Sequence, residues 1–213
     1  MAKIGGMPNV VFSLYGVLLE GPGPEDRQRI EAAAGVEDPE AFWRVYSQLR
    51  PEYEAGLISD KQWWQKVANR AGLVEFSIAE AVAADFGARL DANEDMVAYA
   101  EQLIDEGHQV GVLANLPVGL ARLVRAKHTW LGDLAAVAMS CDIGVAKPDP
   151  RAYAVAVDAL GATVKDTLYF DANPSWVAGA REVGLRSYLI SGVPSVKQVL
   201  ATEPRKAPRN KRG

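Results

Sequence analysis

The sequence predicts an α/β fold, in which a doubly wound parallel sheet carries an inserted bundle of helices. Three features of the chain predict it. A short β-rich run stands near the N-terminus, a long stretch of helical pattern follows it, and short apolar runs then alternate with helical stretches. Such alternation is typical of βαβ units, whose strands share one parallel sheet. Right-handed crossovers make that sheet Rossmann-like.

The first strand and the inserted helices occupy the N-terminal part of the chain. The strand is expected at Asn9–Ser13 (NVVFS). One helix is expected from Pro24, because Pro and the two acids after it suit a first turn, and another after Asp38. The third and fourth are expected after Ser59 and Ser77, since Ser is a favourable N-cap. Four helices in series without a strand predict a small bundle.

The C-terminal part of the chain is predicted to complete the sheet. Gly107 and Gly184 each follow a helical stretch and are suitable helix ends. Four helices, each with a strand after it, are expected at 94–106 and 109–114, 118–126 and 135–140, 149–160 and 167–171, and 175–183 and 186–190. The alternation of short strands with longer helices predicts that all these strands join the first one in a single parallel sheet.

The predicted organisation has three parts. Residues 1–19 and 92–202 are expected to form the Rossmann-like core, residues 20–91 a four-helix cap domain, and residues 203–213 a basic tail. The tail holds five basic residues between Arg205 and Arg212 and no acid. It is therefore expected to be disordered, and either the tail or the cap could bind a protein partner.

Composition limits the classes of partner and the compartment. The net charge of −4 gives no reason to expect nucleic acid as a partner. No apolar run approaches the ~18 residues of a membrane helix, and the N-terminus lacks the apolar core of a secretory signal. Cys141 is the one cysteine, which excludes an intrachain disulfide and a cysteine metal cluster. We expect a cytoplasmic protein that does not bind a membrane.

In a doubly wound sheet, ligands bind at the carboxyl ends of the strands. Four segments of this chain that are expected to lie there contain residues that could bind a ligand or take part in catalysis. The four segments are Ser13-Leu14-Tyr15-Gly16, Ala114-Asn115, Lys147-Pro148-Asp149 and Asp171-Ala172-Asn173. Here the chain resembles the haloacid dehalogenase-like (HAD) hydrolases that carry a helical cap after the first strand. The likeness covers residues 9–200 and is carried by VVFSLYGVLLEG, VGVLANLP, GVAKPDPRAY and LYFDANPSWVAGAREVGL, while YEAGLISDKQWW is similar to cap segments of sugar-phosphate phosphatases.

The first family motif departs from the pattern at both catalytic positions. The resemblance implies D-x-D-G, with the first Asp as nucleophile and the second as general acid/base, yet Ser13 and Tyr15 stand there. The chemistry needs a carboxylate that attacks the substrate and forms a covalent intermediate. Dehalogenases of the superfamily are similar in carrying Tyr at the position of Tyr15, but they keep the first Asp. The sequence therefore predicts a degenerate catalytic motif.

The other family motifs survive in part. The Ser or Thr that would bind the transferring phosphoryl group is Ala114, and the motif lysine is present as Lys147. Of the acidic pair in the last motif, Asp171 remains and is followed by Ala172. Asp171 is thus the one remaining candidate metal ligand, and a single carboxylate is not enough for a dedicated Mg²⁺ site. No cofactor is expected unless the protein is an active hydrolase.

Two functions follow as hypotheses. In the first, the protein is catalytically inactive and binds a protein partner or a small anion, the latter through Lys147, Asp171, Asn115 and backbone N–H groups after Ser13. The alternative for that site is a purely structural role, in which Lys147 and Asp171 form an ion pair that only stabilises the loops. In the second hypothesis, the protein is an active hydrolase on a small phosphate ester or organic acid, by a non-standard route through Ser13 or Tyr15.

Overall fold

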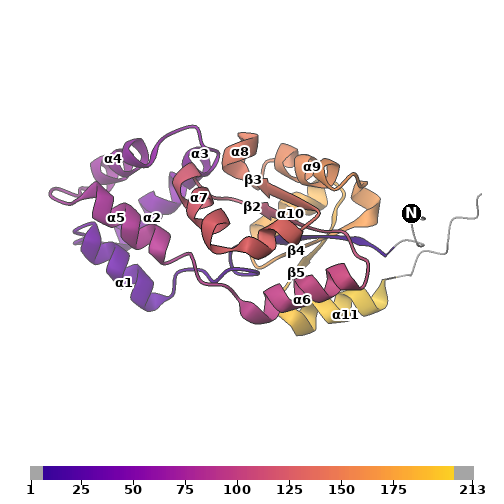
Figure 1. Cartoon of the computed structure of the whole chain (residues 1–213). Helices are drawn as coiled ribbons and strands as arrows, with labels where there is room; N and C mark the ends of the chain where they lie inside the picture. Colours follow the sequence, from indigo (N-terminus) through magenta and orange to yellow (C-terminus); the bar gives the residue numbers. More distant parts are fainter. Residues whose placement is uncertain (1–6, 204–213) are drawn as a thin grey trace, which may run out of the picture.

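The computed structural model describes residues 7–203, in which five parallel strands form one sheet with the order β3-β2-β1-β4-β5 (Figure 1). The strands are β1 (Asn9–Ser13), β2 (Val110–Ala114), β3 (Ala136–Met139), β4 (Thr167–Asp171) and β5 (Arg186–Leu189). β1 is central and pairs with β2 on one side and β4 on the other. The strand order reverses at this point, so the carboxyl ends of β1 and β4 adjoin where open α/β sheets bind ligands. The predicted doubly wound sheet is confirmed.

Helices cover both faces of the sheet. One face carries α6 (Glu94–Asp105), α7 (Val118–Lys127) and α11 (Val193–Thr202), and the other carries α9 (Pro150–Ala159) and α10 (Pro174–Glu182). Successive strand residues point to opposite faces. Val10 and Phe12 accordingly join the cluster under α6, whereas Val11 joins the cluster under α9. Figure 1 shows α6 and α11 side by side along the sheet.

The inserted segment between β1 and α6 contains helices joined by loops, with no named strand, and its helices lie at one end of the molecule (Figure 1). Its helices are α1 (Pro24–Ala33), α2 (Pro39–Gln48), α3 (Arg50–Glu54), α4 (Asp60–Ala71) and α5 (Ile78–Gly87). The four helices expected from the sequence are present, and α3 is an addition. We predicted one helix after Asp38, but the chain turns at Leu49 and starts the short α3, with Pro51 in its first turn.

Helix α4 begins with a capping box at Ser59. The hydroxyl of Ser59 accepts a hydrogen bond from the N–H of Gln62 at 3.3 Å, and the Gln62 side chain accepts from the N–H of Ser59 at 2.9 Å. Replacing Ser59 with Ala is expected to lower the free energy of unfolding by about 1 kcal/mol. Ser59→Gly is the control, with an expected loss of only a few tenths of that. Equal losses in urea titrations of both variants would contradict the cap.

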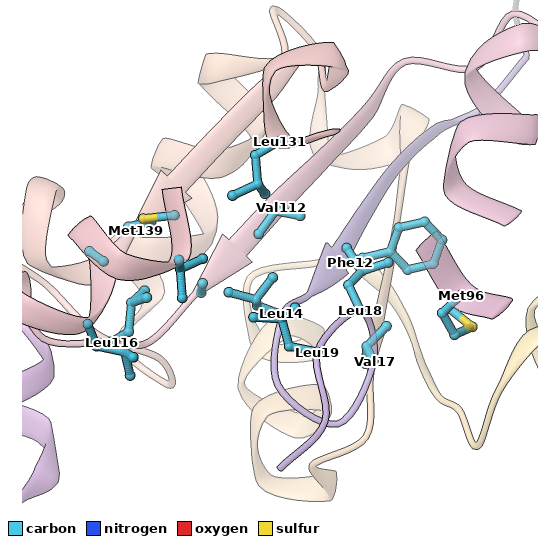
Figure 2. Packing of buried hydrophobic residues seen from close by; sticks show 14 of the residues in the cluster. Phe12, Leu14, Val17, Leu18, Leu19, Met96, Val112, Leu116, Leu131 and Met139 are labelled. Carbon is cyan, nitrogen blue, oxygen red and sulfur yellow. The ribbon is translucent and has the colours of Figure 1, made fainter. Parts of the chain in front are cut away.

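The cap and the sheet share one continuous cluster of buried apolar side chains. Phe12 at the end of β1 belongs to it, as do Trp63 and Trp64 of α4, and all three are fully buried. Figure 2 shows Leu14 and Leu19, from the segment that leaves β1, gathered beside Phe12. Because burial of large apolar side chains is the main stabilising term in folding, the cap and the core stabilise each other.

The structure also contains elements that the sequence patterns did not predict. They are α8 (Ser140–Ile143), the 3-10 turns at Thr129–Asp133 and Val164–Asp166, and the last helix, α11. The predicted tail lies outside the described residues except for Glu203. None of the helices within residues 7–203 has the length and apolar character needed to cross a membrane.

Candidate functional site

Three of the predicted site residues meet at the carboxyl ends of the strands. Ser13 ends β1, Asp171 ends β4, and Lys147 lies between α8 and α9. Lys147 Nζ donates hydrogen bonds to Ser13 Oγ at 2.8 Å and to Asp171 Oδ2 at 3.0 Å. Its third bond goes to the hydroxyl of Tyr169, also at 3.0 Å. An ammonium group has three N–H donors, so these bonds occupy all of them.

The carboxylate of Asp171 is fully engaged as well. Oδ2 accepts from Lys147 and from the Tyr169 hydroxyl, and Oδ1 accepts from the N–H of Asn173 at 2.8 Å. The side chains of Lys147 and Asp171 expose no surface, and Ser13 is buried. Each charge is therefore paired inside the protein, as a buried ion pair requires.

Burial changes the proton affinity of this group. Burial lowers the pKa of Lys147, and the charge of Asp171 opposes that shift without cancelling it. The pKa of Tyr169 is raised well above its usual value by burial and then by the Asp171 charge. The Tyr169 hydroxyl therefore stays protonated and remains a donor to Asp171.

Sequence reasoning missed Tyr169. It stands inside the apolar run TLYFD, where an aromatic residue is expected to pack. The available signal was the period of a strand, since residues two apart lie on the same face. That period places Tyr169 beside Asp171, and its hydroxyl can then reach the same lysine.

Asn115 forms two hydrogen bonds with the backbone of Lys147. Its side-chain amide donates to the carbonyl of Lys147 at 3.0 Å, and its carbonyl oxygen accepts from the Lys147 N–H at 2.8 Å. These two bonds hold the loop that presents the lysine. Ala114, which ends β2, is buried beside Asn115.

Neither of the remaining degenerate positions, Tyr15 and Ala172, supplies a hydrogen bond to the ion pair. The Tyr15 ring lies 5.9 Å from the guanidinium of Arg89, and its buried hydroxyl has no hydrogen-bond partner among the residues described. Burial raises the pKa of Tyr15 far above its usual value. Ala172 is exposed at the surface beside Gly16, where an added Cβ would lie 3.2 Å from the Ala172 methyl.

Trp176 covers the ion pair. Its ring centroid lies 4.1 Å from Lys147 Nζ, close enough for a cation–π interaction. The contact with the ammonium adds to the interactions that stabilise the charged form of Lys147 in a buried position.

The donor set does not suit Mg²⁺. Magnesium takes oxygen ligands in a near-octahedral arrangement and is usually anchored by one or two carboxylates. Here Ser13, Tyr15 and Ala172 stand where the resemblance predicts acids, and the Lys147 ammonium lies between Ser13 Oγ and Asp171 Oδ2. Across residues 7–203, no group of three or more His, Cys, Asp or Glu side chains is arranged to hold a metal.

A second buried charge cluster lies in the cap. Asp85 of α5, which is fully buried, accepts from Arg50 Nη1 at 3.3 Å and from Arg89 Nε at 3.0 Å. Tyr46 donates to Asp85 at 2.5 Å and accepts from both arginines. Arg50 also donates to Glu54 at 2.8 Å. This cluster was not among the sites predicted from the sequence.

Comparison with known proteins agrees with the resemblance. A family model described as haloacid dehalogenase-like hydrolase matches residues 9–184. Phosphatase MT3486 of Mycobacterium tuberculosis is 38% identical over 112 residues, a segment that makes up 52% of this chain and 52% of that protein. The chain therefore spans about half the length of this relative.

Solved structures share the fold at low sequence identity. The HAD family enzyme bt-2542 from Bacteroides thetaiotaomicron has a TM-score of 0.71 and 19% identity, covering 86% of this chain and 93% of that one. A predicted HAD-like family hydrolase from Porphyromonas gingivalis has a TM-score of 0.69 and 20% identity, covering 92% and 99%. The L-2-haloacid dehalogenase RSc1362 has a TM-score of 0.70 and 19% identity, covering 92% and 100%. The bt-2542 enzyme has also been solved with magnesium and inorganic phosphate.

Proposed function

The chain belongs to the haloacid dehalogenase-like hydrolase family, and we propose that it is a non-catalytic member that works by binding. The hydrogen bond from Lys147 Nζ to Ser13 Oγ carries this proposal. Nucleophilic catalysis needs a group whose electron pair is free and activated by a base. Ser13 stands at the nucleophile position instead, and its hydroxyl oxygen accepts a hydrogen bond from the buried Lys147 ammonium. This hydrogen bond lowers the nucleophilicity of the hydroxyl.

We favour a protein partner over a small anion as the ligand. An anion at Lys147 would have to displace Ser13, Tyr169 or Asp171, because these three residues occupy every N–H of the ammonium. The Asn115 side chain is likewise engaged by the backbone of Lys147. The cap surface and the tail at 205–212 remain the candidate surfaces for a partner.

Hydrolysis through Ser13 is a second candidate function, and one distance favours it. Lys147 Nζ lies 2.8 Å from Ser13 Oγ, within reach for a lysine that removes the serine proton. Burial lowers the pKa of Lys147, which helps such a base. Asp171 opposes this role, because its charge holds the proton on Lys147.

The proposal predicts the outcome of a turnover assay. The wild-type protein is expected to hydrolyse phosphomonoesters and 2-haloacids no faster than a Ser13→Ala variant purified in parallel, with or without Mg²⁺. The physical reason is that the site lacks both an activated nucleophile and a suitable metal donor set. Phosphate release and halide release are the measurements.

The Ser13→Ala variant separates the two candidate functions. It keeps the Lys147–Asp171 pair and so is expected to fold, whereas a Lys147 variant would mix loss of stability with loss of activity. Turnover that is independent of Mg²⁺ and absent from Ser13→Ala would support the serine route. Turnover that Mg²⁺ stimulates in both proteins would overturn the proposal, because a site that does not use Ser13 would then be active.

A further inference from the structure

We propose that the helical cap is held closed on the core by two contacts remote from its linkers, so that Ser13 is not uncovered by hinge motion in the native protein. This inference goes beyond the proposed function, since it concerns the cap of a catalytic or a non-catalytic chain alike. Three attachment places carry it: the paired linkers, the contact of α3 with α8, and the contact of α4 and α5 with α7.

The linkers form the first attachment. The segment that leaves β1 and the segment that returns to α6 are hydrogen-bonded to each other, from Glu20 N–H to the Asp91 carbonyl at 2.8 Å and from Asn93 N–H to the Leu18 carbonyl at 3.0 Å. A rotation of the cap would turn about this pair of segments. Attachments elsewhere on the cap decide whether such a rotation occurs.

The second attachment joins the end of α3 to α8. Ser140, which is fully buried, donates from its hydroxyl to the Glu54 carbonyl at 2.5 Å and accepts from the Leu116 N–H at 2.9 Å. The neighbouring Gly56 has φ +72°, and a Cβ there would lie 2.9 Å from the carbonyl oxygen of Cys141. The cap backbone therefore touches the core backbone with no room for a side chain.

The third attachment joins α4 and α5 to the start of α7. A Cβ at Gly119 would lie 2.8 Å from the Phe86 ring and 2.9 Å from Asp60 Oδ2. Asp60 is itself held, because the Tyr53 hydroxyl donates to its Oδ1 at 2.8 Å. Two cap helices thus approach the core at a position that admits only glycine without a shift.

Opening the cap about the linkers would break both remote attachments and the shared apolar cluster at once. Interfaces that are packed in this way do not deform gradually. The site around Ser13 is therefore expected to open only when the whole molecule unfolds. Any partner would then bind the closed form from outside.

The first test compares the direction in which two Gly→Ala substitutions change Tm. Ala is a better helix former than Gly, so Gly87→Ala, at the last residue of α5 with nothing within 4 Å, is expected to raise Tm by about 1–4 °C. Gly119→Ala, at the second residue of α7, is expected to lower Tm by about 2–10 °C, because its methyl meets Phe86. A rise in both variants would overturn the tight contact.

The second test measures access to the interior by thiol labelling. Ser13→Cys is made in a Cys141→Ala background, with Ala172→Cys in the same background as the exposed control. The Cys at position 13 is expected to label at least about 1,000-fold more slowly than the control. Its rate should rise with urea with the same slope as global unfolding, since only unfolding exposes it.

Labelling of position 13 that is fast, or that hardly depends on urea, would overturn the closed cap. If Ser13→Cys fails to fold, Ala114→Cys is the substitute, since Ala114 is equally buried at the end of β2. Neither labelling nor Tm depends on turnover, so a failed proposal on activity would leave this test unaffected, and the reverse also holds.

Discussion

Replacing Lys147 with Met is expected to lower the free energy of unfolding by about 3–5 kcal/mol. Met keeps an unbranched apolar side chain but removes the ammonium. The carboxylate of Asp171 would then remain buried with only the Tyr169 hydroxyl and the Asn173 N–H as donors. Urea unfolding followed by tryptophan fluorescence measures the loss.

A double-mutant cycle separates the charge pair from lost packing. Asp171→Asn alone leaves the Lys147 ammonium without its counter-charge, so it is expected to cost a similar amount. The variant that carries both changes has no unpaired charge and is expected to lose well under the sum of the two single losses. Strictly additive losses would mean that the Lys147–Asp171 pair is not coupled.

The regular elements were predictable because their signals are local. Period-two and period-3.6 patterns, N-caps such as Ser59 and C-terminal glycines such as Gly107 mark strands and helices within a few residues of their observed ends. The short α3 and α8 were missed because five and four residues carry no periodicity. The last helix, α11, was missed, although Pro194 in its first turn was a usable signal.

The site was predictable as a set of positions but not as a set of contacts. The order of motifs placed Ser13, Lys147 and Asp171 at one edge of the sheet. Which atoms pair there depends on depth in the sheet and on a third side chain, Tyr169, that no motif marks. A carboxylate at position 13 would give Lys147 a second counter-charge, whereas the uncharged hydroxyl of Ser13 leaves Asp171 as its ion-pair partner.

For the buried charge cluster of the cap, formed by Tyr46, Arg50, Asp85 and Arg89, the sequence likewise indicated positions but not contacts. The spacings Arg50–Glu54 and Asp85–Arg89 are both four residues and are visible in the sequence as helix-face pairs. Taken alone, such pairs predict weak, exposed ion pairs. In the structure, hydrogen bonds from Tyr46 of α2 and Arg50 of α3 to Asp85 of α5 join the two pairs into one buried network.

Asp85→Asn is expected to lower the free energy of unfolding by about 3–5 kcal/mol at neutral pH. The substitution keeps the shape of the side chain but leaves Arg50 and Arg89 nearly buried, with Glu54 as the remaining counter-charge of the cluster. Glu52→Gln is the control, because it removes an exposed ion pair with Lys66 and should cost less than about 1 kcal/mol.

The pH dependence of this loss follows from the pKa of Asp85. Burial opposes ionisation, but the charges of Arg89 and Arg50 outweigh it and lower the pKa below the ordinary value of 3.8. A carboxyl group with a lowered pKa in the folded state contributes stability above its unfolded pKa and loses it as the pH falls through the folded pKa. The difference between wild type and Asp85→Asn should therefore be constant from pH 7 to pH 5 and shrink below about pH 4.

The number of transitions in the unfolding curve of Asp85→Asn shows whether the cap and the core unfold together or separately. The cap shares its apolar cluster with the core, so Asp85→Asn should shift one cooperative transition to lower urea without changing its slope. A cap that unfolded by itself would give two transitions, with only the first sensitive to Asp85→Asn. Two transitions would show that the cap cluster stabilises the cap alone, and the remote contacts at Gly56 and Gly119 would then be too weak to join cap and core into one cooperative unit.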